Sequence, residues 1–218
     1  MGGRMDWTLF GAMVTGFFAI INPISTAPIF ANVTAGSSAA VRAQVARRAV
    51  AIAFGVIALF TVSGNLIFGL FGITLTAFRI VGGGLVMIVG FEMVHGQPSQ
   101  VQSPTDEDQE DCRETQLSVA VSPLATPLIA GPGTISTAMG FAGDGNVVRV
   151  GMTLVAAAIV CAVTLVAFLF SGRLMGFLGQ SGLNVVSRLM GLIIAVIGMQ
   201  MLMMGVYAAI AGYASYAK

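Results

Sequence analysis

Two proline-containing segments inside long apolar runs constrain this chain more than any other feature. Pro23 and Pro28 lie in the first run, and Pro127 and Pro132 lie in a later one. Proline removes a backbone donor and clashes with the carbonyl four residues earlier, so we expect a helix to be interrupted at both places. In a bilayer, interrupted backbone is tolerated only where protein buries it or a polar cavity borders it. Matching interruptions in two halves of a membrane chain are typical of a transporter's binding site.

The composition indicates an integral membrane protein, whose first partner is the lipid bilayer. Of the 218 residues, 56% are hydrophobic and 9% are charged, whereas soluble domains carry about 25% charged residues. The net charge of +1 and the lack of a basic patch give no indication of nucleic-acid binding. A spanning helix needs roughly 20 mostly apolar residues. Six runs meet that requirement: residues 7–30, 49–71, 75–94, 117–141, 147–170 and 185–209.

An acidic segment divides the chain into two halves. Residues 97–116 hold six of the nine acidic residues, and their composition is typical of a disordered linker; an acidic regulatory or partner-binding segment is the alternative. Three spans per half is an odd number, so the second half must enter the membrane from the opposite face. We therefore predict an all-α integral membrane domain over residues 1–218, with six transmembrane helices in two inverted three-helix repeats, residues 1–96 and 117–218. The first and fourth helices are expected to be discontinuous.

The third and sixth spans share a pattern, and the arginines predict an orientation. Arg79 is followed by Gly82 in the third span, and Arg188 by Gly191 in the sixth. Six of the ten basic residues fall on one side of a six-span arrangement, including three in the short segment before the second span. The positive-inside rule then places that side and the acidic linker in the cytoplasm, with both termini outside.

The interrupted segments supply the candidate binding residues. Their freed carbonyls, hydroxyls and amide suit a small polar solute, and the start of a half-helix suits a carboxylate. Isolated prolines are common in membrane helices and usually only kink them, so a purely structural role is the competing interpretation. The predicted binding residues are Asn22, Pro23, Ser25, Thr26, Pro28, Gly131, Pro132, Gly133, Thr134, Ser136 and Thr137.

Few other residues suggest chemistry. Glu92 is the acidic residue inside an apolar run, with Gln200 as its counterpart in the second half, so this pair is a candidate for coupling to H⁺ or Na⁺. Glu92 is near the end of its span, and an interfacial, snorkelling role is equally expected. Arg79 and Arg188 open their spans and are expected to anchor at the interface. The sequence holds no metal-ligand spacing, phosphate loop or nucleophile–histidine pair, so we expect no metal, no cofactor and no enzymatic activity.

Four segments together resemble one known family. Residues 21–30 (INPISTAPIF), 78–83 (FRIVGG), 127–136 (PLIAGPGTIS) and 183–191 (LNVVSRLMG) look like the MarC family of six-span inner-membrane proteins, in the family's order and over essentially the whole chain. The resemblance implies a bacterial cytoplasmic-membrane protein with periplasmic termini. It also implies transport of small neutral amino acids, a property of some members, including exporters.

We therefore expect a secondary transporter of small neutral amino acids, of the glycine, alanine and serine class, that works by alternating access. The alternative is a non-transporting membrane scaffold or assembly protein whose interrupted helices only shape packing. The oligomeric state does not follow from the sequence.

Overall fold

The regular secondary structure of the described residues is helical. The computed structural model describes residues 6–35, 37–96, 129–143 and 146–216. The helices are α1 (Trp7–Ile21), α2 (Pro23–Val33), α3 (Ala39–Phe71), α4 (Leu75–Val94), α7 (Pro132–Ala142), α8 (Val147–Leu169) and α9 (Ser171–Tyr216).

Polar side chains begin several of these helices. Asp6 accepts hydrogen bonds from the amides of Thr8 and Leu9 at the start of α1. The Thr8 hydroxyl also donates to this carboxylate, and these bonds, that of the hydroxyl foremost, lower the pKa of Asp6. Ser38 caps α3 by accepting from the amide of Val41. Each cap satisfies amides that the first turn of a helix leaves unpaired.

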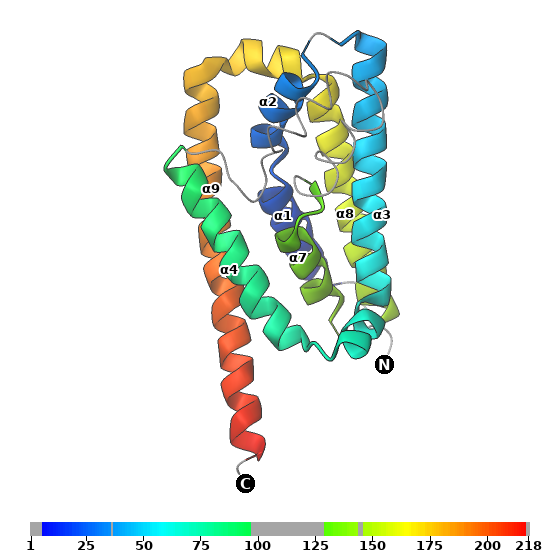
Figure 1. Ribbon diagram of the computed structural model, residues 1–218, viewed down its shortest axis with the longest axis vertical. Coiled ribbons are helices and arrows are strands. Elements are labelled where there is room, and N and C mark those ends of the chain that lie inside the picture. The colour runs from blue at the N-terminus through cyan, green and yellow to red at the C-terminus, as the bar shows by residue number, and fades with distance from the viewer. Residues whose placement is uncertain (1–5, 36, 97–128, 144–145, 217–218) are drawn as a thin grey trace.

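The main core lies where α1, α2, α3 and α8 meet, with part of α7. Figure 1 shows α3 and α8 side by side along one flank, with α1 and α7 beside them in the middle of the bundle. Phe30 of α2 stacks on Phe168 of α8, with ring centroids 4.4 Å apart, and both side chains are fully buried. Met13, Phe17 and Ile21 bury one face of α1 in the same core.

Helices α4 and α9 cross through glycines that approach each other's backbone. A Cβ atom on Gly83 would lie 2.7 Å from the carbonyl oxygen of Gly198, and one on Gly198 would lie 2.7 Å from that of Gly83. Gly90 and Gly191 form the same reciprocal contact, at 2.6 and 2.9 Å. Small residues allow this close approach in membranes, where packing rather than hydrophobic burial holds helices together. Gly83, in the glycine run at 82–84, therefore serves close helix packing.

Gly82, the neighbouring residue, faces a different helix. A Cβ atom there would collide with the Oγ atom of Ser136 on α7, and one on Gly133 of α7 would collide with Val86 of α4. Consecutive helical residues point about 100° apart. As a result, α4 packs closely against α9 through Gly83 and against α7 through Gly82.

Most of the predicted spans are present, with different bounds. Within the described residues, five helical stretches are long and apolar enough to cross a membrane, rather than the predicted six. For the predicted span at 117–141, the structure describes α7, its cap residue Gly131 and the two residues before that cap, and no earlier residue. The acidic linker at 97–116 also lies outside the described residues.

Two helices are longer than predicted. Helix α3 begins at Ala39, ten residues before the predicted start, because the intervening alanines, arginines and glutamine are good helix formers. Helix α9 begins at Ser171 and contains a kink at Gly179, whose φ of 62° is open mainly to glycine. Arg173, which precedes the predicted span, and Arg188 both lie within α9. Near its C-terminal end, α9 extends beyond the other helices (Figure 1).

Candidate functional site

The first interruption is confirmed, and it is confined to Asn22. This residue has φ 46° and ψ 70°, the left-handed conformation, and separates α1 from α2. The backbone amide of Asn22 donates to the carbonyl of Phe18 at 2.9 Å, and the side-chain Oδ1 of Asn22 accepts from the backbone amide of Ser25 at 3.3 Å. Asn22 thus ends one helix with its backbone and begins the next with its side chain. Asparagine tolerates this conformation better than most residues.

The prediction of an unwound segment as far as Pro28 is wrong. Pro28 lies inside α2, which continues to Val33. The Thr26 backbone amide donates to the carbonyl of Asn22 at 3.1 Å, as in a regular helix, and the Thr26 hydroxyl donates to the same carbonyl at 3.0 Å. The missing proline donor leaves one gap in the hydrogen-bond ladder, which a helix packed in a membrane protein can accommodate.

Helix α2 is connected to α9 through two serines. The Oγ atoms of Ser25 and Ser187 lie 3.0 Å apart. Nearby, Asn22 is 3% exposed, and its Nδ2 atom is buried without a hydrogen-bond partner in the described structure. The α1–α2 junction is therefore packed against protein.

The second interruption precedes α7. Gly131 is the cap residue, without a side-chain hydrogen bond, and Pro132 is the first helical residue. The Thr134 hydroxyl donates to the carbonyl of Ile129 at 2.9 Å, which ties the start of the helix to the chain before it. Helix α7 therefore begins at the predicted position, while Pro127 lies outside the described residues.

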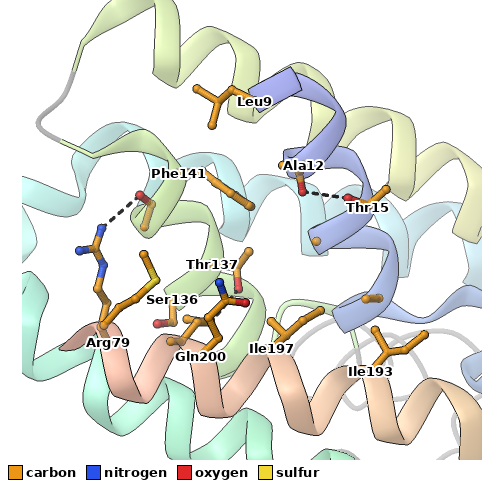
Figure 2. A pocket seen from close by; sticks show the side chains of 15 residues that line it. Leu9, Ala12, Thr15, Arg79, Ser136, Thr137, Phe141, Ile193, Ile197 and Gln200 are labelled. Carbon is orange, nitrogen blue, oxygen red and sulfur yellow. Dashed lines mark hydrogen bonds between the residues drawn. The ribbon is translucent and has the colours of Figure 1, made fainter. Parts of the chain in front are cut away.

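A cavity of ≈ 590 Å³ lies between α1, α4, α7 and α9. All the α1 residues that line it precede Asn22, so it lies on the side of the break that carries both termini (Figure 1). Figure 2 shows the lining side chains, among which Thr15, Arg79, Ser136, Thr137 and Gln200 carry polar groups. The remaining lining residues are Leu9, Ala12, Gly16, Ala19, Gly140, Phe141, Ile193, Ile197, Met201 and Met204.

Arg79 brings the positive charge to this cavity. Its Nη2 donates to the carbonyl oxygen of Gly140 on α7 at 3.3 Å, as Figure 2 shows. Arg79 is partly buried and is the charged residue among those that line the cavity. The expected role as an interfacial anchor did not include this contact across to α7.

Ser136 and Thr137 differ in their hydrogen bonds. Ser136 is 0% exposed, and its Oγ has no hydrogen-bond partner in the described structure. The Thr137 hydroxyl donates to the Sδ atom of Met201 at 3.6 Å, a weak bond. A buried hydroxyl without a partner costs free energy, so Ser136 is a polar group left unsatisfied among the residues that the structure describes.

The structure brings together only some of the predicted site residues. Ser136, Thr137 and Gln200 line the cavity. Glu92 does not line it: it lies beyond the Gly90–Gly191 contact of the α4–α9 crossing, whereas Gln200 lies near the Gly83–Gly198 contact. The Oε2 atom of Glu92 is buried and has no hydrogen-bond partner among the described residues. The predicted residues that do not line the cavity are Asn22, Pro23, Ser25, Thr26, Pro28, Gly131, Pro132, Gly133 and Thr134.

Sequence reasoning missed Arg79 and Thr15 as cavity residues. A signal for Arg79 was available: it lies one turn inside an apolar run and three residues before Gly82, on the same helical face. An ionisable residue within a span is by default a candidate functional residue. No comparable signal marks Thr15, whose hydroxyl donates to the carbonyl of Gly11 at 2.9 Å.

Comparisons with known proteins identify a family of integral membrane proteins. The family model for the MarC family integral membrane protein matches residues 7–210. The UPF0056 membrane protein YvbG of Bacillus subtilis (strain 168) is 38% identical over 186 residues, which cover 85% of this chain and 88% of that protein. The UPF0056 inner membrane protein MarC of Escherichia coli O1:K1 / APEC is 30% identical over 222 residues, 94% of this chain and 98% of that protein. No solved structure matches the chain.

Proposed function

This chain belongs to the MarC family of integral membrane proteins, and from that premise we propose that it is a secondary transporter of small neutral amino acids that works by alternating access. It is a multi-pass protein of the inner membrane. The cavity between α1, α4, α7 and α9 is the observation that carries the proposal. It joins one cationic and several neutral polar side chains to mostly apolar walls, the usual character of a small-molecule site.

The proposal includes an inverted repeat, in which α1 to α4 correspond to the second half of the chain. Helices α2 and α7 both begin at a proline and both have 11 residues. The same offset along the chain separates Pro23 from Pro132 and Arg79 from Arg188. The reciprocal contacts of Gly83 with Gly198 and of Gly90 with Gly191 are those expected when equivalent helices cross about a two-fold axis. Such repeats are common in alternating-access transporters.

The proposed orientation places the termini in the periplasm. Arg42, Arg47 and Arg48 lie near the start of α3, at the end of the bundle opposite the termini (Figure 1). Positive charges favour the cytoplasmic side, so residues 97–116 are assigned to the cytoplasm as well. In this orientation the cavity lies on the periplasmic side of the α1–α2 break.

Counterflow of radiolabelled L-alanine in proteoliposomes tests the proposal. Unlabelled L-alanine inside the vesicles should drive uptake of the label, and imposed H⁺ or Na⁺ gradients should reveal the coupling ion. Absence of counterflow for glycine, L-alanine and L-serine contradicts the proposal and favours the non-transporting scaffold. The proposal assigns the protein no enzymatic activity.

Filling the cavity provides a matched pair of variants. Ala12→Trp places a large ring in the cavity and should abolish counterflow. Ala51→Trp adds the same ring to the exposed face of α3 and should leave counterflow near the wild-type rate. Equal counterflow rates of the two variants would show that transport does not pass through this cavity.

A further inference from the structure

The charge of the cavity restricts what it binds. Arg79 is charged, and the other fourteen lining residues carry no acidic or basic group. A charge in a membrane protein is costly to place and usually serves a pathway or a partner. A cavity with one guanidinium and no carboxylate in its lining attracts an anionic group and repels an isolated cation.

Most of the hydrogen-bonding capacity of Arg79 is not used by the described residues. The guanidinium has five N–H donors in a planar fork. Within the described residues, its hydrogen bond is the one from Nη2 to the carbonyl of Gly140, and no carboxylate pairs with it. The planar fork matches the two oxygens of a carboxylate.

Ser136 lies one helical turn from this contact. Arg79 and Gly82 are three residues apart on α4, and Ser136 and Gly140 are four residues apart on α7. Each pair shares a helical face, and the two faces meet, because Arg79 bonds to Gly140 while Ser136 packs on Gly82. Because its hydroxyl has no partner among the described residues, no hydrogen bond from them opposes a rotation about χ1 that turns Oγ toward the cavity.

We propose that Arg79 binds the carboxylate of the transported solute, with the Ser136 hydroxyl as a second donor after that rotation. This inference rests on the proposed function. It adds to that function the group of the solute that the cavity recognises, which is the carboxylate. The ammonium group of an amino acid then points away from Arg79, toward the neutral oxygens of Thr137 and Gln200.

A purely structural role for Arg79 makes different predictions. Gly140 lies in the last turn of α7, where a cation favourably meets the negative end of the helix dipole. If Arg79 only stabilises α7, its removal lowers the melting temperature without changing which solutes bind. Solute selectivity therefore distinguishes the carboxylate-binding role of Arg79 from the purely structural one.

The test compares three probes with purified protein in detergent. L-alanine carries both charged groups, propionate carries only the carboxylate, and L-alaninamide carries only the ammonium. In the wild type, L-alanine and propionate should raise the melting temperature, because they bind the native state, and L-alaninamide should not. Arg79→Gln should weaken the binding of both carboxylates about 10- to 100-fold, the range for a hydrogen bond to a charged group.

Three further variants complete the experiment. Arg149→Gln removes an exposed arginine from the start of α8, outside the cavity, and should leave all three responses unchanged. Arg79→Lys keeps the charge without the planar fork and should weaken L-alanine binding at least about 5-fold. Ser136→Ala should weaken it about 3- to 10-fold, as expected for one hydrogen bond. If Arg79→Gln does not fold, Arg79→Lys decides: unchanged affinity overturns the inference.

The outcomes separate this inference from the proposed function. Counterflow of L-alanine with an unchanged KM in Arg79→Gln overturns the carboxylate role and leaves the transporter intact. Propionate that stabilises the wild type but not Arg79→Gln, without counterflow of any amino acid, supports the carboxylate site and contradicts amino-acid transport. An unchanged ratio of L-alanine to L-alaninamide affinity in Arg79→Gln shows that Arg79 is only structural.

Discussion

Helices α2 and α7 begin alike but have different surroundings. Each has 11 residues, starts at a proline and follows an interruption. No residue of α2 lines the cavity, and its Ser25 lies against Ser187 of α9, whereas α7 contributes Ser136, Thr137, Gly140 and Phe141 to the cavity wall. A shared sequence signature therefore does not give the two helices equal access to the cavity. In an alternating-access transporter this asymmetry is expected of any single conformation.

Thiol labelling should show the largest contrast between the two helices. Thr26 of α2 is 3% exposed, while Gly140 of α7 lines the cavity. In a background lacking Cys112 and Cys161, we expect Gly140→Cys to react with a membrane-impermeant reagent about 100-fold faster than Thr26→Cys, because reaction at Thr26 requires local opening. Gln200→Cys serves as a positive control, since Gln200 is exposed in the cavity wall. Equal labelling rates at positions 26 and 140 would show that α2 and α7 do not differ in their access to water.

Gly82→Val should displace α7 from α4. The new side chain occupies the position of the Ser136 hydroxyl, and overpacking of this kind costs about 1–3 kcal/mol. Thermal unfolding in detergent measures the loss. The control is Gly55→Ala in α3, where nothing lies within 4 Å; it should be neutral or stabilising by about 0.5–1 kcal/mol. A Gly82→Val variant as stable as the wild type means that α7 is not packed as described.

Asn22→Ala should destabilise the α1–α2 junction by about 1–2 kcal/mol. It removes the side-chain cap of α2 and places a Cβ residue without local hydrogen bonds at φ 46°. Asn22→Gly keeps the backbone conformation and should recover most of this loss, because replacing a cap by glycine costs only a few tenths of a kcal/mol. Chemical denaturation of both variants tests the difference. If glycine proves as harmful as alanine, the left-handed backbone is not the feature that matters here.

The Ser25–Ser187 contact should have the smallest effect. A neutral hydrogen bond contributes about 0.5–1.5 kcal/mol, and a double-mutant cycle with Ser25→Ala and Ser187→Ala isolates the pair. We also expect Ser25→Ala to increase labelling at Thr26→Cys, because it weakens the contact between α2 and α9. A coupling energy of zero shows that the two hydroxyls do not hold these helices together.

Local chemistry explains what the sequence could predict. The interruption at residues 22–23, the bounds of α4 and the start of α7 follow from proline, glycine and capping residues, whose effects extend over one turn. The expected interruption at Pro28 is absent because tertiary packing maintains α2 despite one missing donor. The interrupted segments alone did not reveal the cavity, because its walls come from four helices whose relative placement depends on close glycine contacts. The role of Arg79 in the cavity depends on its contact with Gly140 of α7, which is distant in the sequence.

The adjacent contacts of Gly82 and Gly83 have a consequence for motion. Two neighbours approach α4 from directions about 100° apart, each without a side chain as a spacer. A twist of α4 about its own long axis would lose both fits at once, whereas tilting with α9 attached keeps the Gly83 and Gly90 contacts. Insertion of a single residue between positions 82 and 83 would change this rotational register and separate the three helices. We therefore expect α4 and α9 to move together as one rigid unit.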